Sequence, residues 1–251
     1  MKKSVLQNCI YALCGVGVLI AVWVIAYYRV GNELVVPSFF DCVKDVGELL
    51  VKERFWRYFL NTFKRVFFAF VISFFVASAF ALLAYVVPVV RGILSPIISL
   101  MRSLPILAVT LILWLMFGRE DAPIAVAFLS LFPMLYAAML SALSGVDGDL
   151  IEMSRVYNVP LKKRIFSLYM PAAAPYVLQE SGAALAFSLK LVVSAEVLVG
   201  TYRSVGYLMN DANQIPDMSL LFALVCMTAL VGLILESIAL GFARAVERRV
   251  K

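Results

Sequence analysis

The chain has 251 residues, of which 63% are hydrophobic and 15% are charged, and its formal net charge is +6. Soluble proteins carry about 25% charged residues, so this composition excludes an ordinary soluble domain and indicates a polytopic helical membrane protein. In such a protein the excess of Lys and Arg marks cytoplasmic loops, not a nucleic-acid-binding surface.

Six apolar stretches approach or exceed the length of about 20 residues that a membrane-spanning helix needs. In chain order they cover residues 8–28, 60–87, 96–117, 122–143, 172–199 and 218–242. They leave only short loops and no room for a separate soluble domain. The sequence therefore predicts an all-α fold of about six transmembrane helices.

The first apolar stretch follows Lys2 and Lys3 and ends before Arg29 without a small-residue cleavage site, which predicts a retained signal anchor. The positive-inside rule places these lysines and the basic tail in the cytoplasm, so both termini are expected inside. Residues 29–57 would then lie outside although they carry five Lys or Arg. This conflict leaves open the alternative that residues 8–28 do not form a full span.

The chain divides into two predicted parts. Residues 1–58 would form the anchor span and an outer amphipathic segment, and residues 59–251 would form the main transmembrane domain. Within the second part, Lys64 and Arg65 are expected to snorkel to lipid headgroups. Residues 88–95 would form an inner loop, Pro105 would kink the third span, and residues 118–121 would form a tight outer turn.

Residues 147–171 form the longest charged interruption in the second half of the chain. Asp149 is a predicted helix N-cap, with Glu152 three residues later in the position of a capping-box carboxylate. Leu150, Met153 and Tyr157 recur at helical spacing and would form one apolar face. A membrane protein that builds such a helix outside the bilayer is expected to offer it to a partner.

The same interruption contains signals for a sharp turn and a second helix. Asn158 tolerates the left-handed conformation that ends a helix, and Pro160 prevents the helix from continuing. A second helix is expected over residues 161–169. Pro171 is expected to end the loop.

This stretch resembles the cytoplasmic "EAA" loop of permeases of binding-protein-dependent ABC importers. That pattern is Glu-Ala-Ala, three residues, Gly, nine residues and Ile-x-Leu-Pro. Here Glu152-Met153-Ser154 stands for the triplet, Asn158 for the glycine, and residues 168–171 for the closing tetrad. Further matches resemble the nitrate, sulfonate, taurine and bicarbonate branch: Val36-Pro37-Ser38, Arg102-Ser103-Leu104-Pro105, residues 113–118, Phe132-Pro133, residues 171–175 and Ala195-Glu196.

The resemblance implies a type I importer permease of the inner membrane that forms the pathway for a small solute. Such a subunit pairs with a second permease copy, receives its solute from an extracytoplasmic binding protein, and rests its coupling helix on a separate ATPase subunit. The residues expected to couple to the ATPase are Leu150, Glu152, Met153, Arg155, Tyr157, Asn158 and Pro171. This chain has no Gly-x-x-x-x-Gly-Lys-Ser/Thr phosphate loop, so ATP and Mg would bind the partner, and the chain itself would be no enzyme and hold no cofactor.

Ionisable residues inside a span are costly and usually face a cavity or a partner, which makes Lys190 and Glu196 candidates for the pathway or its gate. Snorkelling of Lys190 and an outer-interface position of Glu196 are the open alternatives. Lys190 suits an anionic solute, although one charge does not select the solute.

A second hypothesis is a stand-alone ion-coupled carrier or channel, which would use carboxylates within the spans: Glu180, Glu196 and Glu236. An intramembrane enzyme is disfavoured because the sequence has no histidine and no paired catalytic residues. The four cysteines form no metal or disulfide spacing, and no metal site is predicted.

Overall fold

The computed structural model describes the backbone of residues 2–250 and the side chains of residue 11 and residues 14–245. All regular structure in this range is helical. The elements are α1 (Lys2–Val30), α2 (Phe39–Val51), α3 (Glu53–Val86), α4 (Pro88–Ser103), α5 (Ile106–Ser144), α6 (Gly148–Val156), α7 (Leu161–Arg164), the π-helix η1 (Ile165–Tyr169), α8 (Met170–Val199), α9 (Val205–Gln214) and α10 (Met218–Val250).

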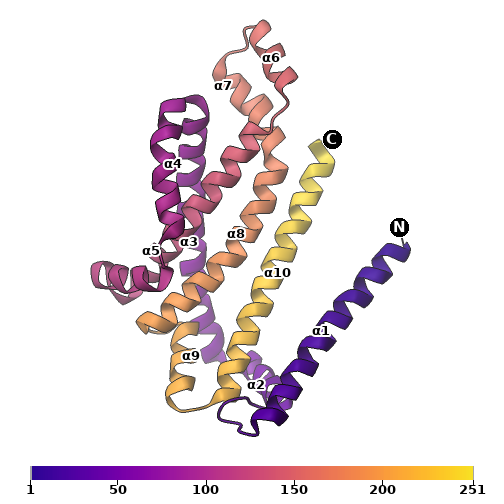
Figure 1. Ribbon diagram of the computed structural model, residues 1–251, viewed down its shortest axis with the longest axis vertical. Helices are drawn as coiled ribbons and strands as arrows, with labels where there is room; N and C mark the ends of the chain where they lie inside the picture. Colours follow the sequence, from indigo (N-terminus) through magenta and orange to yellow (C-terminus); the bar gives the residue numbers. More distant parts are fainter. Residues whose placement is uncertain (1, 251) are drawn as a thin grey trace.

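Four helical segments of the described chain are long and apolar enough to cross a membrane: Glu53–Val86, Ile106–Ser144, Leu161–Val199 and Met218–Ala245. They form the body of the molecule, in which α5 packs against α3 and α8, and α8 also packs against α10. Figure 1 shows α6 and α7 at one end of the molecule, and α2 and α9 at the other end. The chain therefore has two distinct poles joined by long helices.

Small side chains let α3 approach its neighbours closely. Ala69, Ser73, Ala77 and Ala81 follow each other at four-residue spacing, and all four are fully buried. Four residues make about one helical turn, so these positions form a single narrow stripe along α3. Stripes of small residues are typical of contacts between membrane helices, because backbones can then pack at short range.

The structure corrects the predicted boundaries of the third span. Residues 88–95 are not an inner loop, because α4 begins at Pro88, whose fixed φ suits the first turn of a helix. Leu104 and Pro105 are extended and separate α4 from α5. Since the residue before a proline is pushed out of the helical region, the predicted kink at Pro105 is a complete break. The segment 96–117 therefore belongs to two helices.

The predicted outer turn at residues 118–121 is a sharp change of direction within α5. Gly118 has φ 77° and ψ −179°, which a residue with a side chain rarely adopts. The first part of α5 lies across the molecule, and the later part runs alongside α3 and α8 (Figure 1).

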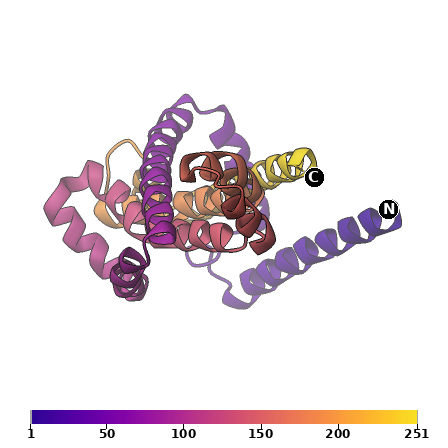
Figure 2. The same ribbon diagram turned by 90° about the horizontal axis from the view of Figure 1, so that it is seen from above.

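The N-terminal helices are attached to α10 at the pole opposite α6. The Cys42 thiol of α2 donates to the Ser219 carbonyl at 3.6 Å, and the Ser219 hydroxyl donates to Asp45. Burial raises the pKa of the Cys42 thiol to about 11, so it stays protonated at neutral pH. Trp23 of α1 packs on Phe222 with ring centroids 5.4 Å apart. From there α1 diverges from the body in both views (Figure 2).

The predicted boundary between residues 58 and 59 falls inside α3, which begins at Glu53. The structure thus has no loop at that position. The division of the chain into an anchor part and a main domain stays a prediction.

Candidate functional site

The short helix α6 follows α5 and precedes α7 and α8, at the pole opposite α2 and α9 (Figures 1 and 2). Its N-cap is Asp147, whose carboxylate accepts a hydrogen bond from the Asp149 backbone N–H at 3.0 Å. The prediction that Asp149 caps the helix is therefore wrong by two residues. With Asp147 as the cap, the capping-box position falls on Leu150, so Glu152 does not have that role.

The end of α6 has the geometry that the sequence predicted. Asn158 adopts φ 50°, in the left-handed region. Its backbone N–H donates to the Arg155 carbonyl at 2.9 Å, and the Val159 N–H donates to the Ser154 carbonyl at 3.0 Å. These two bonds are those of a Schellman motif, which satisfies the last carbonyls of a helix and turns the chain sharply.

One face of α6 is apolar and open. Leu150, Met153 and Tyr157 are 44%, 57% and 74% exposed, and none of the nine residues of α6 is buried. Val156 is 72% exposed and extends this face. It was not among the predicted residues, although it lies three residues after Met153, a helical spacing. Glu152 and Arg155 are also exposed, on the opposite side of the helix.

The segment after α6 differs from its prediction. The second helix is the four-residue α7, which continues through η1 into α8. Pro171 does not end a loop but lies in the first turn of α8, where a missing N–H is tolerated. Tyr169, at the end of η1, is buried and packs on Tyr85 of α3 with centroids 5.2 Å apart. The helix α7 is therefore continuous with α8.

Glu196 lies in a buried polar network near the other pole. Its side chain has no exposed surface. Its carboxylate accepts hydrogen bonds from the Thr62 hydroxyl at 2.8 Å, an Arg65 guanidinium nitrogen at 3.1 Å and the Gly206 backbone N–H at 3.3 Å. The network therefore joins α3, α8 and α9.

Arg65 extends this network to the turn in α5. Its guanidinium also pairs with Glu120, and its side chain is only 13% exposed. The prediction that Arg65 snorkels to lipid headgroups is wrong, because both of its charged partners belong to the protein. Buried charges need such partners, since the desolvation of an unpaired ion is costly.

Lys190 lies elsewhere, on the wall of an open cavity of about 530 Å³. The other lining residues come mainly from α8 and α10 and are largely apolar, among them Leu107, Val193, Met209 and Val225. Glu196 does not line this cavity. The structure thus separates the two residues that were grouped as pathway candidates, and their role in the pathway stays a prediction.

The arrangement is that of a helical membrane body with an exposed apolar helix at one pole. A family model described as "Binding-protein-dependent transport system inner membrane component" matches residues 69–251. This chain belongs to that family. It is a permease component of an ABC importer, as the loop spacing predicted, and the all-α polytopic fold is confirmed with it.

Individual relatives agree with this assignment. The putative aliphatic sulfonates transport permease protein SsuC of Bacillus subtilis is 28% identical over 236 residues, which are 93% of this chain and 83% of the relative. The taurine transport system permease protein TauC of Escherichia coli is 27% identical over 65% of this chain and 58% of its own length. The inward-facing MetNI methionine ABC transporter shares the fold, with a TM-score of 0.66 and 17% identity over 74% of this chain and 93% of that chain.

Membership of the family has a direct consequence for energy coupling. In these importers ATP is hydrolysed by separate ATPase subunits, and the solute comes from a binding protein. The permease must therefore contact both a partner that supplies energy and a partner that supplies solute.

Proposed function

We propose that two copies of this permease line a solute pathway across the inner membrane, with both termini in the cytoplasm. Each copy docks α6 in a groove of an ATPase subunit, which binds the ATP and Mg. The opposite pole, with α2 and α9, receives an extracytoplasmic binding protein that delivers the solute.

The observation that carries this proposal is the open apolar face of α6. Leu150, Met153, Val156 and Tyr157 are all more than two-fifths exposed, and no residue of α6 is buried. An amphipathic helix with anchors at such spacing is typical of helix-in-groove recognition. Burial of a large apolar side chain contributes about 1.5–3 kcal/mol, so this face supplies a strong driving force for docking.

The connections of α6 explain how docking reaches the membrane. Gly145 to Asp147 join it to α5, and a turn at residues 157–160 joins it to α7, which continues through η1 into α8. Because α5 and α8 pack along each other, a displacement of α6 moves both helices together. Closure of the ATPase dimer around ATP would draw two such units together and shift the permease pair between inward-open and outward-open states.

The relatives suggest the chemical class of the solute. Two of these relatives are named as transport permeases for aliphatic sulfonates and for taurine. We therefore propose that this permease carries a small solute with an oxyanion group.

The docking proposal is tested by placing a charge on the apolar face of α6. We expect Met153→Asp and Tyr157→Asp each to reduce affinity for the ATPase about tenfold or more, because buried anchors dominate such interfaces. The measurement is co-purification of the ATPase with the permease, followed by titration of ATPase activity in the reconstituted complex.

The matched control is Ile215→Asp, which introduces the same charge at a 70% exposed apolar residue beyond the end of α9, at the opposite pole. It should leave ATPase binding unchanged. If Met153→Asp and Tyr157→Asp bind the ATPase as tightly as the control does, α6 is not the docking element.

A further inference from the structure

A polar stripe runs along α4, although this helix lies among membrane-spanning neighbours. Arg91, Ser95, Ser99 and Arg102 follow each other at intervals of four, four and three residues, which places them on one face of the helix. The other side of α4 carries exposed apolar residues: Val89, Ile93, Ile97 and Leu100. Polar stripes inside a membrane usually face a water-filled cavity, because lipid cannot solvate them.

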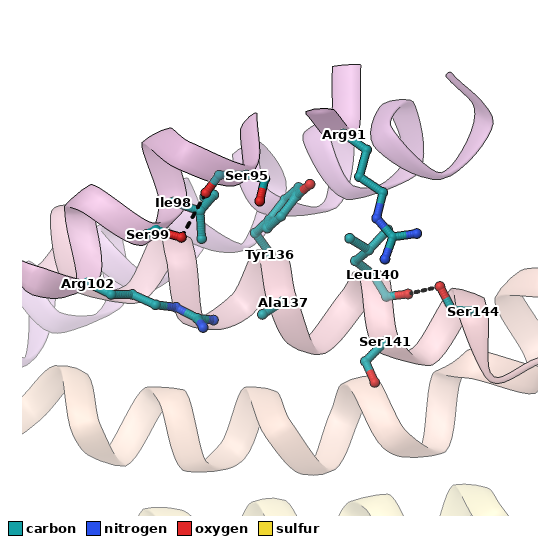
Figure 3. Close-up of a pocket in the computed structure, with 10 residues that line it drawn as sticks. All are labelled: Arg91, Ser95, Ile98, Ser99, Arg102, Tyr136, Ala137, Leu140, Ser141 and Ser144. Carbon is teal, nitrogen blue, oxygen red and sulfur yellow. Dashed lines mark hydrogen bonds between the residues drawn. The ribbon is translucent and has the colours of Figure 1, made fainter. Parts of the chain in front are cut away.

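The stripe forms one wall of a groove of about 430 Å³ between α4 and α5. The facing wall consists of residues from the later part of α5: Tyr136, Ala137, Leu140, Ser141 and Ser144. Both arginine side chains extend from α4 toward this wall (Figure 3). Arg102 is held there by a hydrogen bond that its guanidinium donates to the Pro133 carbonyl at 3.0 Å.

The groove is cationic and contains no compensating charge. None of its lining residues is acidic, and among the described side chains no carboxylate lies within 4.0 Å of Arg91 or Arg102. Arg65, in the same bundle, has two carboxylate partners. Both groove arginines are exposed and have no carboxylate partner among the described side chains, so they are available to an external anion.

The available donors suit an oxyanion. The Ser99 and Ser144 hydroxyls donate to backbone carbonyls, whereas those of Ser95, Ser141 and Tyr136 make no hydrogen bond within the described chain. A guanidinium presents several N–H groups in one plane and binds sulfonate, carboxylate or phosphate oxygens in pairs. Two such groups with free hydroxyls between them form a site for a small anion.

We propose that the α4–α5 groove binds the oxyanion group of the transported solute, with Arg91 and Arg102 as its principal ligands. This inference rests on the proposed function for the identity of the anion as solute. The groove adjoins the last turn of α5, which leads into α6 within four residues of Ser144. The anion therefore lies on the side of the permease from which it enters the cytoplasm.

The test measures the electrostatic potential of the groove directly. Ser95→Cys is introduced into a cysteine-free permease, which is purified with its ATPase in phosphatidylcholine nanodiscs. Its rate of reaction is compared for an ethylsulfonate methanethiosulfonate reagent and for the trimethylammonium analogue. We expect the anionic reagent to be favoured, and Arg91→Gln or Arg102→Gln to lower the ratio of the two rates severalfold, because loss of a nearby positive charge slows the anionic reagent and speeds the cationic one.

Two controls isolate the groove charges. Arg91→Lys and Arg102→Lys keep the charge and should keep most of the ratio. Arg29→Gln removes an exposed charge at the end of α1 and should not change it. A ratio that stays constant in Arg91→Gln and Arg102→Gln would overturn the proposal.

Ligand protection identifies the source of the anion. Methanesulfonate should slow the reaction of Ser95→Cys, and the neutral dimethyl sulfone at equal concentration should not. Protection by phosphatidylglycerol in the nanodisc, with none by methanesulfonate, would show a lipid site and overturn the assignment to the solute. These rates do not depend on ATP hydrolysis, so a failure of α6 docking would leave them unchanged and remain distinguishable.

Discussion

At the scale of single residues, Glu196 holds three helices together through its carboxylate. The fully buried group binds Thr62, Arg65 and the Gly206 N–H. Removal of one member of a buried ion pair costs about 3–5 kcal/mol, and the second partner of Arg65 reduces that cost. We expect Glu196→Gln to lower the melting temperature of the purified permease by about 5 °C or more.

Transport measured on the same variant separates two roles of Glu196. A structural role predicts lower stability with normal transport per folded complex at low temperature. Poor transport at an unchanged melting temperature would instead support the predicted role at the gate. Glu180→Gln is the matched control, since Glu180 lies on α8 and forms no ion pair within the described chain.

Asn158 ends α6 in a left-handed backbone conformation, so substitutions of this residue act mainly through the backbone. It has φ 50°, which costs about 1–2 kcal/mol for most side chains, while glycine adopts it freely. We expect Asn158→Gly to bind the ATPase as well as the native chain does. Asn158→Ala should bind about fivefold more weakly, which corresponds to about 1 kcal/mol. The measurement is ATPase titration of the reconstituted complex, and a large loss in Asn158→Gly would show that the Asn side chain itself is required.

At the scale of helices, α8 and α10 meet at a glycine. A Cβ atom on Gly182 would overlap the Cβ of Ala239 and lie 3.4 Å from the Ala239 Cα. We expect Gly182→Ala to lower stability by about 1–3 kcal/mol, because an overpacked contact forces the helices apart. The double change Gly182→Ala with Ala239→Gly moves the methyl group across the contact and should restore most of the melting temperature.

The control for this contact lies on α10 as well. Gly241→Ala adds a methyl group where no atom lies within 4 Å, so it should not destabilise the protein. If Gly182→Ala melts at the same temperature as Gly241→Ala, the two helices are not in contact at this position.

The sequence predicted the helices well where local chemistry determines them. The left-handed end of α6 at Asn158 is such a local signal, and it is confirmed. The start of α4 was missed because Pro88, Gly92 and Pro96 resemble a loop when their neighbours are unknown. Pro88 in fact occupies a first turn, and Pro96 is tolerated inside the helix.

The polar networks were harder to predict than the helices. Arg65 and Glu196 are 131 residues apart in the chain, and only the packing of α3 on α8 brings them together. The groove arginines presented a similar difficulty, because residues 88–95 were predicted to be a loop and the polar face of α4 could not be recognised. The local spacing around α6 was sufficient to identify the permease family, whereas the caps and neighbours of α6 required the structure.

At the scale of the whole molecule, the two poles carry different kinds of surface. One has the amphipathic helix α6 with its exposed apolar face, and the other has α2 and α9 (Figure 1). In a bilayer these poles must face opposite sides. Under the docking proposed for α6, the first pole faces the cytoplasm.

This orientation requires α1 to cross the membrane. A helix of 29 residues is about 43 Å long at 1.5 Å per residue, which exceeds the hydrocarbon thickness of about 30 Å. The five basic residues at positions 29–57 would then lie outside, against the positive-inside rule. Three of these five basic residues form ion pairs with carboxylates: Lys52 with Glu48, Arg54 with Asp211 and Arg57 with Glu53.

Labelling from outside the cell tests the orientation and the span together. Single cysteines are placed at Leu34, Ile215 and Tyr157, which are 61%, 70% and 74% exposed, in a cysteine-free permease. A membrane-impermeant maleimide should label Leu34→Cys and Ile215→Cys on intact cells, and Tyr157→Cys only after permeabilisation. Because Leu34 follows α1 directly, protection of Leu34→Cys with labelling of Ile215→Cys would mean that α1 lies along the membrane. Labelling of Tyr157→Cys on intact cells would reverse the whole molecule and separate α6 from any cytoplasmic ATPase.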